Sequence, residues 1–234
     1  MKNVTITVDD PVLEWARIEA ARRGTSVSRM VGDFLGELQR REDAYERAYL
    51  AWRTDERNWR SGGSAAACGF GRTPAQPLES GAEALDCPLT QPVFVDTAVL
   101  LAAEDGAQTA VHTQVRAALD VLWRERAGRV SSVVLAEFYE AATVHARPPM
   151  PQGDARAAIR RYHAWTPWQV DAATLETAWA LQTRHQLAWG DCLSLAAAQH
   201  SGCGQLLSLA LPHGALFGGV QVLHPQHCAL LPQA

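Results

Sequence analysis

Three acidic residues lie at the borders of apolar segments, where chemistry in a folded chain often takes place. Asp96 follows the apolar residues 93–95, Glu137 lies early in an apolar helical pattern, and Asp191 precedes another such pattern. Ligands of parallel α/β sheets gather at the carboxyl ends of the strands. Hard divalent cations prefer oxygen ligands, and magnesium usually takes a few carboxylates together with water and phosphate. The set therefore predicts a magnesium or manganese site, although each acid alone could be a helix cap or a surface residue.

The elements that would position these acids alternate between helix and strand. Helical patterns cover residues 108–126, 132–145, 154–164, 172–185 and 192–200, and short strands are expected near Arg129, Trp168, Gln205 and Val220. This alternation predicts an α/β fold, a parallel sheet flanked by helices, over residues 93–234.

The N-terminal residues follow a different pattern. Residues 2–8 alternate, with Val4, Ile6 and Val8 on one face of a predicted strand and Asn3, Thr5 and Thr7 on the other. Asp9 or Asp10 can cap a first helix, which Gly24 ends, and Ser26 can cap a second helix with an apolar stripe. About forty residues bury too little apolar surface to fold alone, so residues 1–40 are expected to dimerise.

Residues 41–60 combine mixed charge with four aromatic residues at helical spacing: Tyr45, Tyr49, Trp52 and Trp59. They are either a solvated helix with a few aromatics packed on the nearest domain, or an interface segment, because aromatics and arginines are typical interface anchors. Residues 61–92 are rich in Gly, Ser, Ala and Pro and are predicted to be a flexible linker.

Composition excludes several classes. The chain of 234 residues has a formal net charge of −4, no apolar run of eighteen residues and no secretory start, so we expect a cytoplasmic protein without a membrane partner. Its five cysteines are odd in number and lack close paired spacing, which favours reduced thiols over disulfides or a zinc site.

The first forty residues resemble the ribbon-helix-helix family, which is seen in many antitoxins of toxin–antitoxin systems, over residues 2 to about 38. The resemblance implies a dimer whose paired strands enter the major groove of operator DNA. Asn3, Thr5 and Thr7 would face the bases, Lys2 would bind DNA beside them, and amides near Thr25 and Ser26 would hold a phosphate. Residues 1–32 hold five basic and four acidic side chains, which leaves open a dimerisation module that binds no DNA.

Residues 93 to about 225 resemble the PIN-domain ribonucleases, the toxin half of VapBC-type systems. The matching segments are the strand with Asp96, EFY at Glu137, GD at Asp191, the SGC turn, LLSLALPHG and the closing strand VQVLHP. The resemblance implies that Asp96, Glu137 and Asp191 hold Mg2+ or Mn2+, which activates water to attack an RNA phosphodiester.

Together the two resemblances indicate a fused toxin–antitoxin protein. It would oligomerise through the ribbon-helix-helix module and the PIN domain, and the nuclease would be inhibited in cis. In the resembling antitoxins the stretch equivalent to residues 41–60 wraps the toxin, which makes Arg53, Arg57 and Arg60 the candidates for an inhibitory contact.

Two departures bear on catalysis. Ala98 replaces a frequent Asn or Ser, and Ala210 stands where the family usually has a fourth acid. Losing one oxygen ligand weakens a second metal site in particular. Glu104 and Asp105 are either substitutes for the missing acid or acids of a surface loop. The alternatives to a nuclease are therefore a catalytically degenerate fusion that regulates transcription, and a neutralising interaction protein.

Net charge gives no support to an RNA-binding surface, because residues 93–234 hold nine basic and eleven acidic side chains. Arg156, Arg160 and Arg161 form a local cluster on one predicted helix, which is either an RNA path or a solvated helix face.

Overall fold

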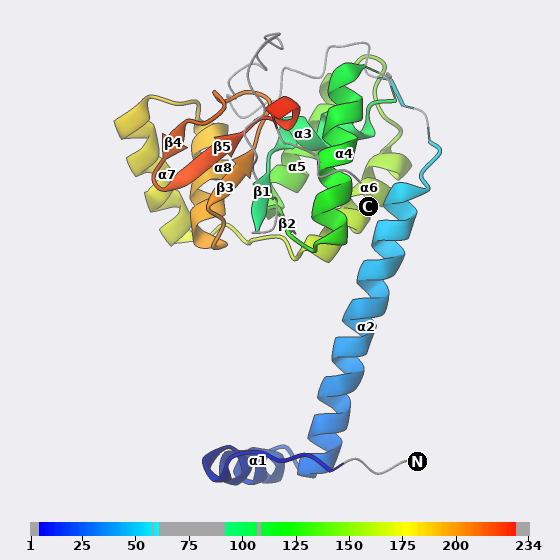
Figure 1. Cartoon of the computed structure of the whole chain (residues 1–234), viewed down its shortest axis with the longest axis vertical. Coiled ribbons are helices and arrows are strands. Elements are labelled where there is room, and N and C mark those ends of the chain that lie inside the picture. The colour runs from blue at the N-terminus through cyan, green and yellow to red at the C-terminus, as the bar shows by residue number, and fades with distance from the viewer. Residues whose placement is uncertain (1–4, 58, 61–91, 107–108, 228–234) are drawn as a thin grey trace. The chain divides into compact units, whose positions relative to one another are not determined.

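The computed structural model describes residues 5–57, 59–60, 92–106 and 109–227 (Figure 1). The chain divides into two compact units, Met1–Arg47 and Ala48–Ala234. We describe each unit by itself. The predicted linker, residues 61–92, lies outside the described residues except for Pro92.

The N-terminal unit is helical. Helix α1 spans Asp10–Arg22, with Pro11 in its first turn, and Gly24 follows in the left-handed conformation at φ 61°. Helix α2 spans Val27–Arg53 and therefore continues into the second unit. The Oγ of Ser26 accepts a hydrogen bond from the amide of Arg29 at 3.2 Å. The predicted positions of the helix starts, the Ser26 cap and the glycine stop are thus confirmed, but the side chain of Asp9 makes no capping hydrogen bond.

The predicted N-terminal strand is not formed in the described residues 5–9 of this single chain. Ile6 and Val8 remain 54% and 45% exposed. A strand needs a neighbouring strand to satisfy its N–H and C=O groups, and the described part of the chain offers none to this segment. Val4 lies outside the described residues.

A five-stranded sheet forms the centre of the second unit, in the order β2-β1-β3-β5-β4. Its strands are β1 Val93–Val95, β2 Gly128–Arg129, β3 Gln205–Leu207, β4 Leu216–Phe217 and β5 Val220–Leu223. β1 pairs in parallel with β2 and β3, and β3 pairs in parallel with β5. The predicted parallel sheet is confirmed, but β4 was missed and pairs antiparallel with β5. The strand expected near Trp168 is reduced to one bridge with Ser131.

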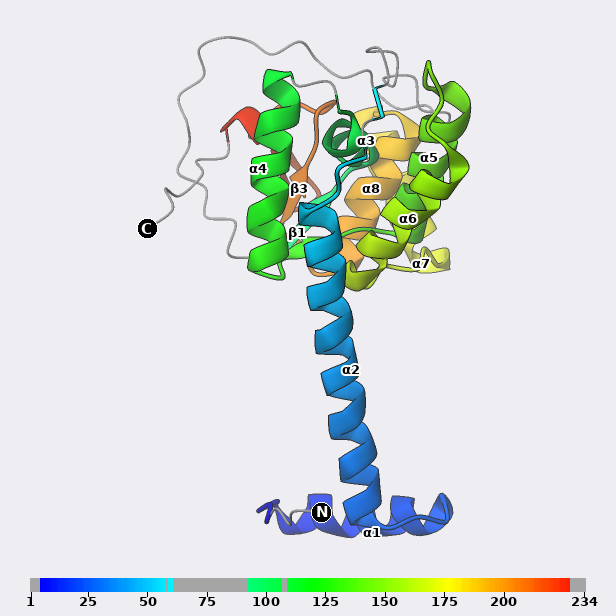
Figure 2. The same ribbon diagram turned by 90° about the vertical axis from the view of Figure 1, so that its right-hand side faces the viewer.

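Helices cover both faces of this sheet, as Figure 2 shows: α4 lies on one side, and α5, α6 and α8 lie on the other. The helices are α3 Thr97–Glu104, α4 Ala110–Arg124, α5 Ser132–Glu140, α6 Gln152–Tyr162, α7 Ala172–His185 and α8 Trp189–His200. A π-helical turn, Ala141–His145, extends α5, and short 3-10 turns cover His163–Trp165 and Pro225–His227. The predicted helical stretches are confirmed to within a few residues at their ends.

The strands have only two to four residues, and the central ones, β1, β3 and β5, are mostly buried. All three residues of β1 are buried, and nine consecutive residues of α8, from 190 to 198, are buried with them. A second part of the core is aromatic. The rings of Trp123 and Trp165 lie 4.8 Å apart, and those of Tyr162 and Trp165 lie 5.3 Å apart. The edge strand β2 passes directly over this cluster at Gly128.

Two further observations concern the described residues. None of their helices is both long and apolar enough to cross a membrane. Cys192 and Cys203 are buried and form no disulfide, as predicted. The other three cysteines lie outside the described residues.

Candidate active site

Asp96 stands at the carboxyl end of β1 and is 1% exposed. It also caps α3, because its Oδ1 accepts a hydrogen bond from the amide of Thr97 at 2.8 Å. Its backbone N–H donates to the carbonyl of Leu207 on the neighbouring strand β3. One residue therefore fixes the end of a central strand, the start of a helix and a buried carboxylate.

Glu137 is joined to this position by Thr97. The Oγ1 of Thr97 donates to Oε2 of Glu137 at 2.5 Å, and Glu137 is 2% exposed. Ser131 caps α5 by accepting from the amide of Val134, so Glu137 follows in the second turn of the helix. The two acids lie 41 positions apart in the sequence, and Thr97 lies between their carboxylates.

Asp191 lies in the first turn of α8 and is fully buried. One turn later on the same helix, the Oγ of Ser194 donates to Oδ1 of Asp96 at 3.2 Å. Residues three apart lie on the same helix face. The face of α8 that carries Asp191 is therefore the face that meets Asp96.

The strand end next to Asp96 carries a serine. Ser208 directly follows β3, and its Oγ donates to Oδ2 of Asp96 at 3.1 Å. The same oxygen accepts from the amides of Ala210 and Leu211, at 3.1 and 3.4 Å. Ala210 is thus held in a turn beside the site and is 2% exposed.

The structure thus brings Asp96 and Glu137 together through one threonine and brings α8 to Asp96 through one serine. Among the described residues, no three Asp, Glu, His or Cys side chains form a ready-made metal-binding group. Sequence reasoning missed Thr97 and Ser194. A usable sign of Ser194 was a hydroxyl three positions after Asp191, with only apolar residues and Cys192 around it in residues 192–198.

The compensating role considered for Glu104 is excluded by its contacts. Both oxygens of this carboxylate are engaged, one by Arg161 at 2.9 Å and the other by the hydroxyl of Tyr162 at 3.1 Å. Its side chain is 9% exposed. Glu104 is therefore neither a metal ligand nor an acid of a solvated loop, but part of a buried ion pair.

Comparison with known families places residues 93–209 in the PIN domain. The match covers half of the chain and includes Asp96, Glu137 and Asp191. The chain belongs to the PIN domain family. The matched residues include strands β1, β2 and β3 and the three acids.

One solved structure similar to the chain is VapC20 of Mycobacterium tuberculosis, described as a toxin that cleaves the sarcin–ricin loop. It is 23% identical, and the similarity covers 49% of this chain and 86% of that chain with a TM-score of 0.37. No curated protein matches the chain.

The end of α2 and the residues after it pack on the PIN domain, within the second compact unit. Trp52 is 1% exposed, and its Nε1 donates to the hydroxyl of Tyr162 at 3.1 Å. The guanidinium of Arg116 lies 3.8 Å from the centre of the Trp52 ring and donates to the Trp52 carbonyl. Tyr49 stacks on Trp123 with ring centres 6.0 Å apart. Both interpretations of this segment expect its aromatic side chains to pack on a domain, and this packing is observed. Helix α2 ends at Arg53 rather than continuing to residue 60.

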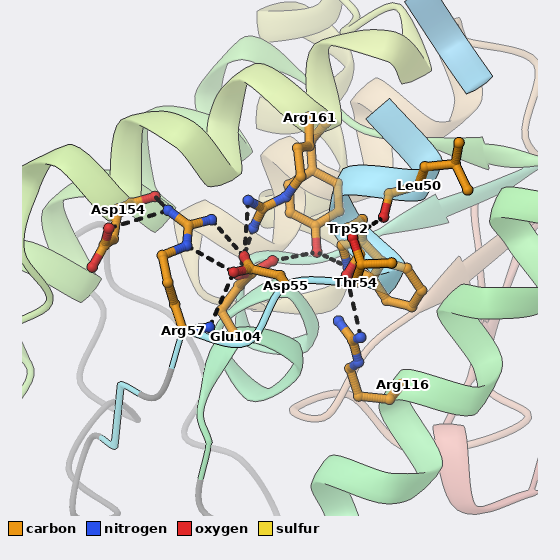
Figure 3. A network of polar contacts seen from close by, with 10 residues as sticks. Leu50, Trp52, Thr54, Asp55, Arg57, Glu104, Arg116, Asp154 and Arg161 are labelled. Carbon is orange, nitrogen blue, oxygen red and sulfur yellow. Dashed lines mark hydrogen bonds and ion pairs between the residues drawn. The ribbon is translucent and has the colours of Figure 1, made fainter. Parts of the chain in front are cut away.

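An ionic network holds the residues that follow α2 (Figure 3). Asp55 pairs with Arg161 of α6 at 2.9 Å, and Arg161 pairs in turn with Glu104 at the end of α3. Burial alone would raise the pKa of Asp55, but hydrogen bonds from Arg57 and the charge of Arg161 outweigh it and lower the pKa. Arg161 is 6% exposed, so for this residue both the RNA path and the solvated helix face are wrong.

The three arginines predicted to approach the acids have different positions. Arg57 binds Asp55 and reaches Asp154 of α6 at 3.2 Å, so its contacts are to α6 and not to Asp96, Glu137 or Asp191. Arg53 is the last residue of α2, and Arg53 and Arg60 are exposed. Between them, Trp59 is 7% exposed and donates to the carbonyl of Pro148 at 3.0 Å. We call residues 48–60 the docked segment.

Of the predicted DNA-binding residues, Thr5, Thr7 and Ser26 are exposed, and Lys2 and Asn3 lie outside the described residues. The amide of Thr25 donates to the carbonyl of Ala20 at 2.9 Å. The phosphate contact from amides near Thr25 and Ser26 stays a prediction.

Proposed function

We propose that this PIN-family protein is a divalent-metal-dependent endoribonuclease, fused to an antitoxin-like N-terminal part that restrains it in cis. The observation that carries the nuclease proposal is the linked pair of buried carboxylates, Asp96 and Glu137, with the Asp191 face of α8 tied to Asp96 by Ser194. Asp96 stands at the carboxyl end of β1, and ligands of α/β proteins bind at the carboxyl ends of the strands.

The donor chemistry fits a hard cation. Asp96, Glu137 and Asp191 would hold Mg2+ or Mn2+, the ions that accept carboxylate oxygens together with water and phosphate. When bound, the metal would supply a water of lowered pKa and stabilise negative charge on the phosphodiester. Thr97 orients Asp96 and Glu137 by donating one hydrogen bond to each. With Ala210 at the fourth position, three acids point to a site for one metal rather than two.

The docked segment supports restraint in cis. Its tryptophans and Asp55 are held by α4, α6 and the loop at Pro148. Arg161, which binds Asp55, also binds Glu104 at the end of α3, and α3 begins directly after Asp96. Because Arg57 binds Asp55 and Asp154, we assign the restraint to docking of the whole segment. Arg53 and Arg60 remain the candidates for a direct inhibitory contact.

A cleavage assay on the full chain tests both parts. Wild type, Trp52→Ala and the double variant Trp52→Ala, Asp96→Asn are incubated with single-stranded RNA and Mn2+. We expect Trp52→Ala to cleave RNA faster than wild type, and the double variant to be inactive because it lacks one metal-binding carboxylate. Equal cleavage by the single and double variants would refute the assignment of Asp96. Equal cleavage by wild type and Trp52→Ala would refute restraint by the docked segment.

We further propose that the N-terminal unit dimerises and binds operator DNA. Apolar residues of this unit are exposed in the single chain, among them Trp15 and Phe34 at 60% each, as expected for the face of a dimer. Ile6 and Val8 would become buried when two strands pair. The test is a gel shift with the upstream promoter, in which Thr5→Ala and Thr7→Ala should weaken binding. An unchanged shift would exclude the strand as the reader of DNA.

The second candidate function is a degenerate PIN fusion that regulates transcription or neutralises related proteins without chemistry. Ala98 and Ala210 favour it, because both positions lack the polar side chain that the resembling family commonly has. This function predicts a gel shift without any Asp96-dependent cleavage of RNA.

A further inference from the structure

Ser194 is a buried polar residue in an apolar environment. It is 1% exposed and lies within the buried stretch of α8, between Leu193 and Leu195. A serine inside a helix commonly donates to the carbonyl of its own preceding turn. The Ser194 hydroxyl instead donates across the core, to Oδ1 of Asp96 at 3.2 Å.

This hydrogen bond joins two elements that each carry a predicted metal ligand. Asp96 lies at the end of β1, and Asp191 lies three residues before Ser194 on the same face of α8. Two further groups donate to this carboxylate: the amide of Thr97 donates to Oδ1, and the hydroxyl of Ser208 donates to Oδ2. Thr97 comes after strand β1 and Ser208 comes after strand β3. Of these three donors to Asp96, only Ser194 lies on α8, the helix that carries Asp191.

We propose that Ser194 is a positioning residue, which sets the orientation of the Asp96 carboxylate and its spacing from Asp191 and thereby determines the affinity for the metal. The proposal rests on the proposed nuclease function. Groups that hydrogen-bond to a metal ligand fix its orientation, and their loss typically lowers metal affinity or activity 10- to 100-fold. With alanine at position 210, the site depends on three acids, so the orientation of each one has a larger effect.

The test measures Mn2+ binding by the full chain, without RNA, by titration calorimetry and by the paramagnetic resonance signal of free Mn2+. Ser194→Ala removes the donor. Ser194→Cys fills nearly the same space with a weak donor, and a thiol is a poor ligand for a hard cation. The matched control is Ser201→Ala, because Ser201 ends the same helix and its hydroxyl donates to the carbonyls of Ala197 and Ala198.

We expect roughly 10- to 100-fold weaker Mn2+ binding for both Ser194→Ala and Ser194→Cys, and unchanged binding for Ser201→Ala. Wild-type affinity in Ser194→Cys would show that Ser194 only fills space and would overturn the proposal. Wild-type affinity in Ser194→Ala would overturn it as well, with the proposed nuclease intact. Absence of Mn2+ binding by the wild-type chain would instead overturn the proposed function, and this role of Ser194 with it.

Discussion

Trp52→Ala is the most direct perturbation of the docked segment. The indole is 1% exposed, stacks under Arg116 and donates to the hydroxyl of Tyr162. Alanine removes the ring and leaves a cavity beside Trp123, whose ring centre lies 6.2 Å from that of Trp52. The hydroxyl of Tyr162 still has Glu104 as a partner, so the main loss is packing.

The expected magnitude follows from this burial. Replacing a buried tryptophan by alanine typically costs about 3 to 5 kcal/mol. Since each 1.4 kcal/mol changes an equilibrium constant tenfold, a loss of about 3 kcal/mol raises the population of the undocked segment roughly 150-fold. The ion pairs of Asp55 with Arg161 and of Arg57 with Asp154 remain in the variant. These pairs should keep part of the population docked.

Limited proteolysis with trypsin measures this population, because the segment contains cleavage sites at Arg53 and Arg57. When docking is fast relative to cleavage, the cleavage rate follows the undocked population. We expect cleavage in the segment to accelerate about 100-fold or more in Trp52→Ala, while cleavage elsewhere changes little. Trp179→Ala is the matched control, because Trp179 is 47% exposed on α7. If both tryptophan variants are cleaved at the wild-type rate, Trp52 does not hold the segment.

Three further perturbations follow from buried groups. Arg161→Met should lower the free energy of unfolding by about 3 to 5 kcal/mol, measured in urea, because the carboxylates of Asp55 and Glu104 lose the cation that they share. An unchanged urea midpoint would contradict a stabilising role of these ion pairs. Gly128→Ala should lower the free energy of unfolding by about 1 to 3 kcal/mol, because a Cβ at this position would lie 2.6 Å from the Trp165 ring. Gly153→Ala is the control in thermal unfolding and should not be destabilising, because a Cβ at Gly153 has no neighbour within 4 Å. Burial and the neighbouring histidines lower the pKa of His224 to about 4. The free energy of unfolding should therefore fall by up to about 3 kcal/mol as the pH is lowered from 6.5 towards 4. His224→Phe should make the free energy of unfolding less dependent on pH, as measured by urea titrations at several pH values.

The sign of this pH effect follows from proton uptake. The unfolded chain protonates His224 near its ordinary pKa of about 6.5, whereas the folded chain resists protonation down to about pH 4. Protons therefore favour the unfolded state throughout this window. The geometry agrees, because Nδ1 of His224 accepts from the amide of Gln226 and Nδ1 of His213 accepts from the amide of His224. A doubly protonated ring would lose its acceptor.

Local sequence pattern was sufficient to predict most of the PIN domain. The apolar residues 93–95 followed by Asp96 predicted a buried strand ending in a carboxylate, and that is how β1 and Asp96 are placed. Helix starts at Ser26 and Ser132 were also predictable, because capping depends on neighbours three or four residues away. β4 was missed, since its two residues follow a turn and give no alternation to detect.

Contacts between distant residues could not be predicted in this way. Arg161 lies beside Arg160 and Arg156 in sequence, which is the pattern of a solvated helix, but its partners Asp55 and Glu104 are 106 and 57 positions away. Ser194 and Asp96 are 98 positions apart. The charge or hydroxyl of such a residue is visible in the sequence, but the partner that determines its role is not.

Helix α3 connects the candidate active site with the contacts of the docked segment. Its eight residues span about 12 Å, with Asp96 capping the start and Glu104 at the end. Glu104 binds Arg161, which binds Asp55 of the docked segment, so the segment and the first acid are attached to opposite ends of one short helix. Docking can therefore restrain Asp96 without covering it. This connection also separates two variants. Trp52→Ala weakens the docking of the segment and leaves the ion pair of Glu104 intact, whereas Arg161→Met removes the ion pairs that Arg161 makes with both Asp55 and Glu104. If α3 transmits the restraint, Trp52→Ala should raise the rate of RNA cleavage without changing the affinity for Mn2+. Arg161→Met should, in addition, weaken Mn2+ binding.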